Sequence, residues 1–410
     1  MSAQSTASRT DHFIDLENKY GAHNYHPLPV VLKEGKGVFV WDVDGKKYYD
    51  FLSSYSAVNQ GHCHPKIIDS LIEQSKKLTL TSRAFHSEEL SLYTKYITDF
   101  FSYDKVLPMN TGAEAVETAL KLCRHWAYKV KNIEKNKAKI IVCNGNFHGR
   151  TLAIISFSSD PDAKKDFGPY ITGFEEIPYN DLPALAEALK DKNVAGFLVE
   201  PIQGEAGVNV PDEGYLSKAK QFCEDANVLF MADEIQTGLG RTGKMLCCDH
   251  ENVRPDILIL GKALSGGTLP VSAVLADDEI MMTIQPGEHG STYGGNPLAC
   301  KVATTSLQVL KEENMSENAA ELGKLFREEL EKLQSPHIVK IRGKGLLNAI
   351  IIGHKDENAA WNLCLKLKEN GLLAKQTHGD IIRFAPPLII TKDQIMDCIK
   401  IIEKSLPALD

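Results

Sequence analysis

Short apolar runs alternate with amphipathic segments through the middle of the chain. Between about residues 65 and 300 the apolar runs predict strands, and the segments with helical spacing predict helices between them. The expected strands are Lys139–Cys143, Gly196–Glu200, Val228–Ala232, Ile257–Leu260 and Val271–Leu275, and the expected helices are His64–Leu78, Ala113–Val130, Leu182–Lys190 and Leu216–Ala226. This alternation predicts an α/β fold with a mostly parallel central sheet and helices on both faces.

The two ends of the chain follow other patterns. Near the start, a short helix and a Pro-punctuated segment precede a hairpin in which Val38–Trp41 and Lys47–Phe51 flank the turn signal Asp44-Gly45. After about residue 305 a charged amphipathic stretch, Thr305–Leu333, leads into further elements. These are expected strands at Ile338–Arg342, Leu346–Ile352, Leu372–Ala374 and Ile381–Phe384, and expected helices at Ala359–Asn370 and Lys392–Leu406. We therefore expect a large domain at 61–305 and a small α+β domain at 306–410, with which the N-terminal segment 1–60 packs.

Composition narrows the class of protein. A chain of 410 residues is too long for one ordinary core, and 43% hydrophobic residues with a net charge of -8 are typical of a globular protein. The mild acidity predicts no nucleic-acid or membrane partner. Residues 1–10 lack the apolar region of a secretory signal, and the nine cysteines form no CxxC pair. Free thiols in a reducing compartment are expected, with a cytoplasmic location as the default.

An acid and a lysine follow two neighbouring predicted strands. Asp233 comes directly after Val228–Ala232, and Lys262 comes just after Ile257–Leu260. Groups at the carboxyl ends of strands in an open α/β sheet point into its ligand crevice. Pyridoxal-phosphate chemistry needs this pair, because a lysine holds the cofactor as a Schiff base while a carboxylate keeps its ring nitrogen protonated. A solvated ion pair is the alternative for either residue alone.

Two further segments add to this pair. The residues Thr111-Gly112-Ala113 open an amphipathic helix, whose free N–H groups and dipole favour phosphate, although Thr111 and Glu114 also fit an ordinary capping box. Phe147 follows another strand and has the shape to stack on a cofactor ring. Arg150, three residues later, has the chemistry to bind a carboxylate. Found alone, each would more simply be a core or surface residue.

Taken together, these motifs resemble the fold-type I, class III aminotransferases, from about residue 20 to the C-terminus. The resemblance implies pyridoxal 5'-phosphate as the cofactor. It implies that Gly112 and Ala113 hold the phosphate, that Phe147 covers the ring and that Asp233 pairs with the ring nitrogen. Gln236 would bond the ring oxygen.

The resemblance also implies the catalytic lysine and the assembly. Lys262 would bind the cofactor and later carry the proton between substrate and cofactor. Thr292, in the segment GSTYGGNP at 290–297, would reach the phosphate in the neighbouring subunit. A homodimer or higher homo-oligomer with active sites at the subunit interface is therefore expected.

Within the class, the segments GAHNYHPLP at 21–29 and FLSSYSAVNQGHCHP at 51–65 resemble the ornithine aminotransferases most closely. Those enzymes transfer the δ-amino group of L-ornithine to 2-oxoglutarate by a ping-pong mechanism, giving glutamate 5-semialdehyde and glutamate. By position, Tyr25 and Arg150 would bind the α-amino and α-carboxylate groups of ornithine. Tyr55 would direct the distal amine to the cofactor. Glu205 would mask Arg383 during the ornithine half-reaction and release it to bind 2-oxoglutarate.

Other interpretations have weaker support. The segment GLGRTGK at 238–244 matches two nucleotide-binding motifs, but Met245 stands where Ser or Thr is needed and no helix follows, so a mobile loop beside the cofactor is preferred. His62-Cys63-His64 are too close in sequence to converge easily on one metal ion, and a loop before a helix starting near Pro65 is expected. The charged stretch 311–332 predicts a solvated helix face in preference to a coiled-coil arm. Another class III enzyme, acting on acetylornithine or 4-aminobutyrate, and a non-enzymatic binding protein on this fold remain alternatives.

Overall fold

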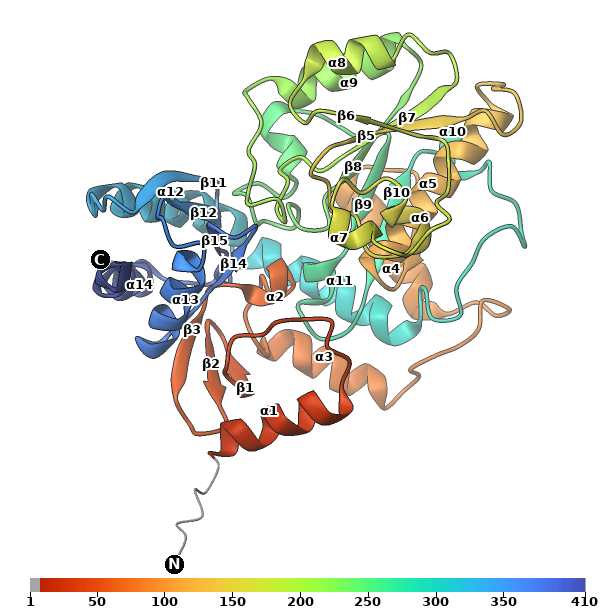
Figure 1. Cartoon of the computed structure of the whole chain (residues 1–410). Helices are drawn as coiled ribbons and strands as arrows, with labels where there is room; N and C mark the ends of the chain where they lie inside the picture. The colour runs from red at the N-terminus through yellow and green to blue at the C-terminus, as the bar shows by residue number, and fades with distance from the viewer. Residues whose placement is uncertain (1–7, 410) are drawn as a thin grey trace, which may run out of the picture.

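The computed structural model describes residues 8–409, and a seven-stranded sheet forms its centre (Figure 1). Of residues 1–10, which lack the apolar region of a secretory signal, residues 1–7 lie outside the described part of the chain. The strand order is β4-β10-β9-β8-β7-β5-β6, and β10 alone in this sheet runs antiparallel to its neighbours. The strands are β4 Lys105–Met109, β5 Lys139–Cys143, β6 Phe174–Ile177, β7 Val194–Val199, β8 Leu229–Asp233, β9 Ile257–Leu260 and β10 Ser272–Ala276. The prediction of a mostly parallel sheet is confirmed.

Both faces of this sheet are buried because successive side chains point to opposite sides. Along β5, Ile140 and Val142 pack with α5 (Gly112–Lys129), whereas Ile141 and Cys143 pack with α8 (Leu182–Ala188) and α9 (Tyr215–Asp225) on the other face. At the β10 end, this other face is covered by α3 (Pro65–Ser75), α4 (Glu88–Phe101) and α11 (Pro297–Glu312). Such burial explains why these strands read as continuous apolar runs.

The N-terminal and C-terminal parts of the chain pack together, as expected. Strands β1 (Leu32–Lys36), β2 (Phe39–Asp42) and β3 (Lys47–Asp50) form a sheet whose fourth strand is β13 (Leu372–Leu373), parallel to β3. A third sheet has the order β11-β12-β15-β14, from Ile338–Lys344, Leu347–Ile352, Ile381–Phe384 and Lys375–Thr377. It packs with α12 (Met315–Lys332) and α13 (Ala359–Glu369), and α14 (Lys392–Ser405) packs on both helices. The division at residues 60 and 305 stays a prediction.

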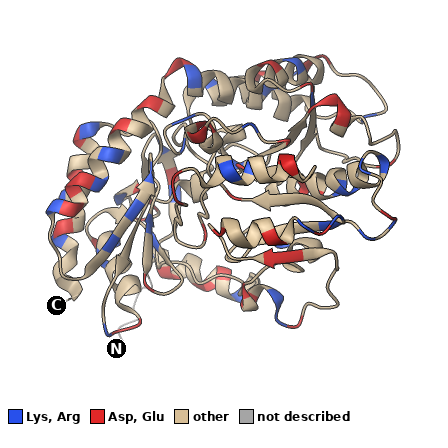
Figure 2. Cartoon of the chain, turned by 90° about the horizontal axis from the view of Figure 1, so that it is seen from above, with Lys and Arg blue, Asp and Glu red and all other residues tan. Residues whose placement is uncertain are grey.

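The remaining helices are short or peripheral. They are α1 (Arg9–Tyr20), α2 (Ser53–Ser56), α6 (Leu152–Ile155), α7 (Pro161–Lys164) and α10 (Asp278–Met281), with 3₁₀ turns at Cys247–Glu251, Lys262–Ser265 and Leu406–Leu409. None of the helices in the described part of the chain is both long and apolar enough to cross a membrane. Acidic and basic residues are interspersed over the chain (Figure 2).

The structure resolves two of the expected segments further. The amphipathic stretch Thr305–Leu333 is not one element, because α11 ends at Glu312 and α12 begins at Met315. Asn314 between them has a φ of +50°, a left-handed conformation that asparagine tolerates and that reverses the chain. The segment Leu372–Ala374 belongs to the N-terminal sheet and not to the C-terminal one. Strands β4 and β6 and helix α4 were not predicted.

The structure also explains the motif-like segments. His62 Nε2 bonds Asp50 at 2.7 Å and His64 Nε2 bonds Glu313 at 3.1 Å, so the two rings have different partners, and α3 begins at Pro65 as expected. The loop 238–244 is largely buried, in contrast to the mobile loop expected. Its Arg241 is fully buried and donates hydrogen bonds to the carbonyls of Leu346 and Pro386 and to Asn59.

Candidate active site

A cavity of about 210 Å³ opens at the carboxyl ends of β8 and β9, and we call it the lysine cavity. The residues that line it come from five separate segments of the large sheet region: Gly112, Ala113, Phe147, His148, Gly149, Glu200, Glu205, Asp233, Ile235, Gln236 and Lys262. β8 and β9 are parallel neighbours, with Asp233 opposite Ile259. The tertiary structure therefore brings the predicted acid and lysine to one sheet edge.

Asp233 is the last residue of β8 and is 5% exposed. One carboxylate oxygen accepts a hydrogen bond from His148 Nδ1 at 2.7 Å, and the other accepts one from the Ile235 N–H at 3.1 Å. Burial acts to lower the pKa of His148, but the hydrogen bond and charge of Asp233 outweigh it and raise the pKa. The hydrogen bond thus couples the His148 ring to the buried carboxylate of Asp233.

Lys262 begins the 3₁₀ turn after β9 and has a φ of +45°, a left-handed conformation uncommon for lysine. Burial lowers the pKa of its amine, against the opposing effect of the carboxylates of Glu205 and Asp233. A lowered pKa increases the fraction of neutral amine, which is the form that attacks carbonyl carbon. The backbone strain and the pKa shift both occur at the residue predicted to carry the chemistry.

Glu200 was not predicted as a site residue. It is buried, and its carboxylate accepts a hydrogen bond from the Phe147 N–H at 2.8 Å. Burial raises the pKa of Glu200 to about 7, and the charge of Asp233 adds to the shift while that of His148 opposes it. The sequence signal was the acid after the apolar run of β7, the same signal that identified Asp233.

The start of α5 fits both interpretations made from sequence. Thr111 and Glu114 form a capping box, in which the Glu114 N–H donates to Thr111 Oγ1 at 3.2 Å and the Thr111 N–H donates to the Glu114 carboxylate at 3.0 Å. The N–H groups at the first helical positions, Gly112 and Ala113, have no acceptor within the helix. Both residues line the lysine cavity, so these donors face a place for an anion.

A second charged pair lies on the other side of the lysine cavity. Arg383 Nη1 donates to Glu205 at 2.8 Å, and the guanidinium lies over the Tyr55 ring at 5.2 Å. Burial acts to raise the pKa of Glu205, but Arg383 outweighs it and lowers the pKa. Gln236 Nε2 lies 3.3 Å from Glu205 and 3.5 Å from the Tyr55 carbonyl. The structure thus pairs Glu205 with Arg383, which the resemblance alone had implied.

Tyr55 belongs to a turn of left-handed helix. The φ angles of residues 53–56 are +48°, +48°, +59° and +71°. Left-handed α conformation costs an L-residue roughly 1–2 kcal/mol, so four in succession occur only where surrounding contacts hold them. Ser53 is tied down by Asp50, whose carboxylate accepts its N–H at 2.9 Å. This turn presents the Tyr55 ring to Arg383.

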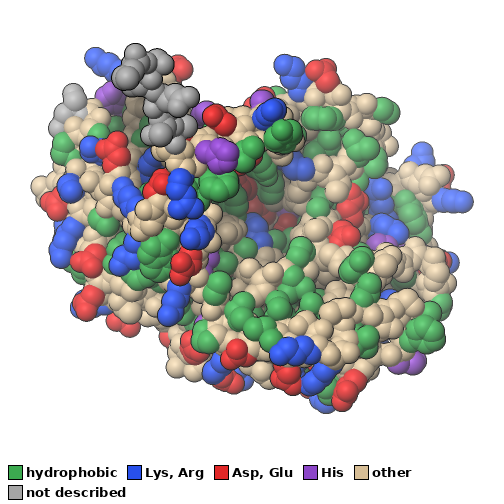
Figure 3. All heavy atoms as spheres, turned by 90° about the horizontal axis from the view of Figure 1, so that it is seen from below, with side chains coloured by type: hydrophobic (Ala, Val, Ile, Leu, Met, Phe, Trp, Pro, Cys, Tyr) green, Lys and Arg blue, Asp and Glu red, His purple; other side chains and the backbone are tan. Residues whose placement is uncertain are grey.

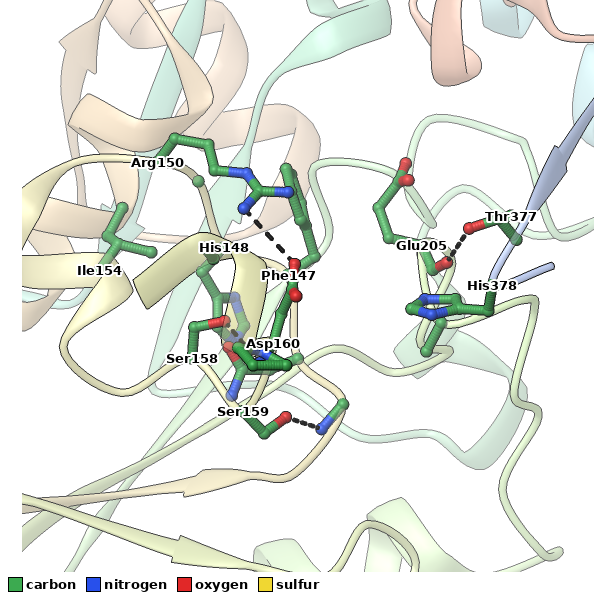
Figure 4. A pocket seen from close by; sticks show the side chains of 16 residues that line it. Phe147, His148, Arg150, Ile154, Ser158, Ser159, Asp160, Glu205, Thr377 and His378 are labelled. Carbon is green, nitrogen blue, oxygen red and sulfur yellow. Dashed lines mark hydrogen bonds and ion pairs between the residues drawn. The ribbon is translucent and has the colours of Figure 1, made fainter. Parts of the chain in front are cut away.

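Arg150 lines an adjoining cavity of about 440 Å³, which we call the arginine cavity (Figure 4). Phe147, His148, Gly149 and Glu205 line both cavities, so the two adjoin. Arg150 lies over the Phe147 ring at 5.4 Å. Figure 4 shows Arg150 and Asp160 on one wall, with Glu205, Thr377 and His378 on the opposite wall.

Five predicted residues do not line the lysine cavity: Arg150, which lines the arginine cavity, and Tyr25, Tyr55, Thr292 and Arg383. Tyr25 is 76% exposed and shares with Tyr55 a third cavity, of about 480 Å³. Thr292 is exposed, in the segment between α10 and α11, and does not line any of these three cavities. The lower face of the molecule is hollowed near its middle, with hydrophobic side chains at the edge and charged ones deeper inside (Figure 3).

Comparisons with known proteins agree with this arrangement. A family model described as aminotransferase class-III matches residues 20–406. The mitochondrial ornithine aminotransferase of Rattus norvegicus is 61% identical over 397 residues, covering 97% of this chain and 90% of the rat protein. A solved ornithine aminotransferase from Toxoplasma gondii has a TM-score of 0.96 at 50% identity, covering 98% of this chain and 94% of that one. A solved acetylornithine aminotransferase from Elizabethkingia anophelis has a TM-score of 0.89 at 60% identity, covering 97% and 99%.

Proposed function

The chain belongs to the class-III aminotransferase family, and from this premise we infer that it transfers the δ-amino group of L-ornithine to 2-oxoglutarate. The products are glutamate 5-semialdehyde and glutamate, and the reaction is ping-pong because the semialdehyde leaves before 2-oxoglutarate binds. The fold is that of the fold-type I enzymes, and the cofactor is pyridoxal 5'-phosphate. The observation that carries the assignment is 61% identity with an ornithine aminotransferase over 97% of the chain, joined to a partly buried lysine and a buried aspartate at one sheet edge.

The residues of the lysine cavity fit this cofactor. The free N–H groups of Gly112 and Ala113 suit its phosphate, the Phe147 ring suits its face, and Asp233 suits its ring nitrogen. The side-chain oxygen of Gln236 is buried without a hydrogen-bond partner among the described residues, so the amide has bonding capacity left for a ligand. When bound, pyridoxal phosphate stores the amino group between the half-reactions and withdraws electrons from the carbon that loses a proton.

The protein's own groups do the positioning and the proton transfer. Lys262 would take the proton from the substrate carbon and deliver it to the cofactor, a role that the lowered pKa of its amine favours. Asp233, which is hydrogen-bonded to His148, places a carboxylate where it would stabilise positive charge on the ring nitrogen. Glu200 holds the Phe147 backbone, and with it the ring that covers one side of the cavity.

Substrate selection depends on which arginine takes the carboxylate. Arg150 binds the α-carboxylate of ornithine, Tyr25 binds the α-amine, and Tyr55 directs the distal amine toward Lys262. Glu205 keeps Arg383 occupied in this half-reaction, because an uncovered Arg383 would attract the α-carboxylate and present the wrong amine. In the second half-reaction the pair opens and Arg383 binds 2-oxoglutarate through two parallel hydrogen bonds. The 2.8 Å contact and the lowered pKa of Glu205 support a closed pair in the free enzyme.

Assembly and location complete the proposal. The enzyme is a homodimer in which Thr292 reaches the phosphate in the partner's site, and the exposure of Thr292 away from its own lysine cavity supports this. Exposed Tyr293 and Phe85 add apolar surface that association would cover. The location is cytoplasmic, for which the support is that all nine cysteines are free. Since the rat relative is named as mitochondrial, cell fractionation is the test of location.

One experiment separates the candidate substrates. L-Ornithine is added alone to the purified cofactor-loaded protein, while the visible absorbance of the cofactor is followed and semialdehyde is trapped with o-aminobenzaldehyde. Bleaching of the band, colour from the trap and recovery of the band with 2-oxoglutarate are expected. Bleaching by N-acetylornithine but not by ornithine would instead favour the activity named for the Elizabethkingia protein.

A further inference from the structure

Arg150, which lines the arginine cavity, and Arg383 each have a carboxylate partner, and the two pairs differ in length and exposure. The Arg383–Glu205 pair is short, at 2.8 Å, and its arginine side chain is 6% exposed. The Arg150–Asp160 pair is longer, at 3.5 Å, and its side chains are 56% and 38% exposed. Water screens an exposed pair far more than a buried one. Arg150 is therefore the arginine that an incoming carboxylate frees more easily.

Asp160 is held in place independently of Arg150. It is the N-cap of α7, where one carboxylate oxygen accepts the Asp162 N–H at 3.0 Å, and its own N–H donates to Ser158 Oγ at 3.2 Å. The other carboxylate oxygen points to Arg150 across the wall of the arginine cavity (Figure 4). Arg150 is in turn placed over the Phe147 ring. Asp160 is thus held by its own backbone contacts, and the Arg150 guanidinium that it faces also contacts the Phe147 ring.

We propose that Asp160 is a specificity-determining residue that competes with the substrate carboxylate for Arg150, as Glu205 does for Arg383. The inference rests on the proposed function, since it takes Arg150 as the site of the α-carboxylate. When substrate binds, its carboxylate replaces the Asp160 carboxylate beside Arg150. Arg150 therefore has a negatively charged partner both in the free enzyme and in the complex. Because the exposed pair opens first, the first carboxylate to enter goes to Arg150 and not to Arg383, which leaves the distal amine of ornithine near Lys262.

The competition has a measurable size. Removal of the Asp160 charge should tighten carboxylate binding by about two- to five-fold, which corresponds to about 0.4–1 kcal/mol and lies within the range that exposed ion pairs contribute. Asp160→Asn is the appropriate change, because asparagine keeps the N-cap of α7 and removes only the charge. Asp162→Asn is the matched control, because Asp162 is exposed, lies two residues away and forms no ion pair among the described residues, so the substitution changes the net charge equally.

The test is calorimetric titration of the cofactor-loaded enzyme with pentanoate, a carboxylate of similar chain length without an amine. Asp160→Asn should bind pentanoate two- to five-fold more tightly than wild type, and Asp162→Asn should match wild type. In the background of Arg150→Gln the substitution should give no gain, since its effect acts through Arg150. In turnover assays the KM for ornithine should fall by the same factor while kcat does not rise.

The opposite results overturn the proposal. Weaker or unchanged pentanoate binding in Asp160→Asn would mean that Asp160 orients Arg150 or does nothing to it, and absence of pentanoate binding in every variant would mean that Arg150 takes no carboxylate. Failure of wild type to turn over ornithine would refute the proposed function instead. In that case the pentanoate titration, which requires no turnover, would still decide the role of Asp160.

Discussion

Relief of the left-handed turn at residues 53–56 should make the protein more stable and a poorer enzyme. Ser54 has φ +48° and ψ +47°, its side chain is exposed, and a glycine there loses only the Cβ that makes this conformation costly. The relief is about 1–2 kcal/mol, and the greater flexibility of glycine in the unfolded chain offsets about 0.5–1 kcal/mol. At the middle of both ranges, Ser54→Gly should therefore gain about 0.75 kcal/mol.

Scanning calorimetry of the cofactor-loaded protein measures the first half of this prediction. At about 2.1 cal/mol/K per residue, a chain of 410 residues that unfolds as one unit shifts its midpoint by about 1 °C per kcal/mol. Ser54→Ala is the control, because it removes the hydroxyl and keeps the Cβ, so its midpoint should not rise. Ser54→Val should lower it, since a β-branched residue suits this conformation least.

Turnover assays measure the second half. The turn positions Tyr55, which is proposed to direct the distal amine of ornithine, so a looser turn should raise the KM for ornithine several-fold while the KM for 2-oxoglutarate changes less. Such a gain in stability with a loss of activity is typical of strain kept at a functional site. A Ser54→Gly midpoint no higher than that of Ser54→Ala would refute the reasoning, because the Cβ would then carry no strain.

Three further changes test other parts of the site. Lys262→Ala should lower kcat by at least about 10²–10⁴-fold, the contribution of a positioned acid–base group, and steady-state assays check this; retained turnover would remove Lys262 from its role. Burial raises the pKa of Glu200 to about 7 in the folded protein, from an ordinary value of 4.5. The wild type should therefore lose stability as pH rises from 4.5 through 7, because the folded state binds the proton more tightly than the unfolded state. Glu200→Gln lacks this ionisation, so in urea unfolding it should match the wild type near pH 4.5 and be more stable than the wild type above pH 7. The same difference in urea midpoint between Glu200→Gln and the wild type at pH 5 and at pH 8 would contradict this. Arg241→Met should cost about 3 kcal/mol in urea unfolding, because it leaves three buried acceptors without their donor, while the neighbouring exposed Lys244→Met should cost well under 1 kcal/mol.

Local sequence patterns were enough to place the ends of the main elements. The apolar runs before Asp233 and Lys262 read as buried strands, and both residues lie at the carboxyl edge of one sheet. The start of α5 was readable from Thr111 and Glu114, because a capping box is formed by residues three apart. Where such signals were weak, prediction failed: the left-handed Asn314 that separates α11 from α12 lies inside an uninterrupted amphipathic pattern.

The sequence by itself therefore determined the class of fold, the acid and the lysine at the sheet edge, and, through its resemblance to a family, the cofactor and the expected substrate. Only the tertiary structure decided which charges meet. Packing brings His148 to Asp233 and Arg150 to Asp160, and each pair joins residues that lie on different segments. Packing also buries Glu200 deeply. The physical reason is that element formation depends on neighbours a few residues apart, whereas burial and charge pairing depend on how those elements pack, and these set the pKa values on which the chemistry depends.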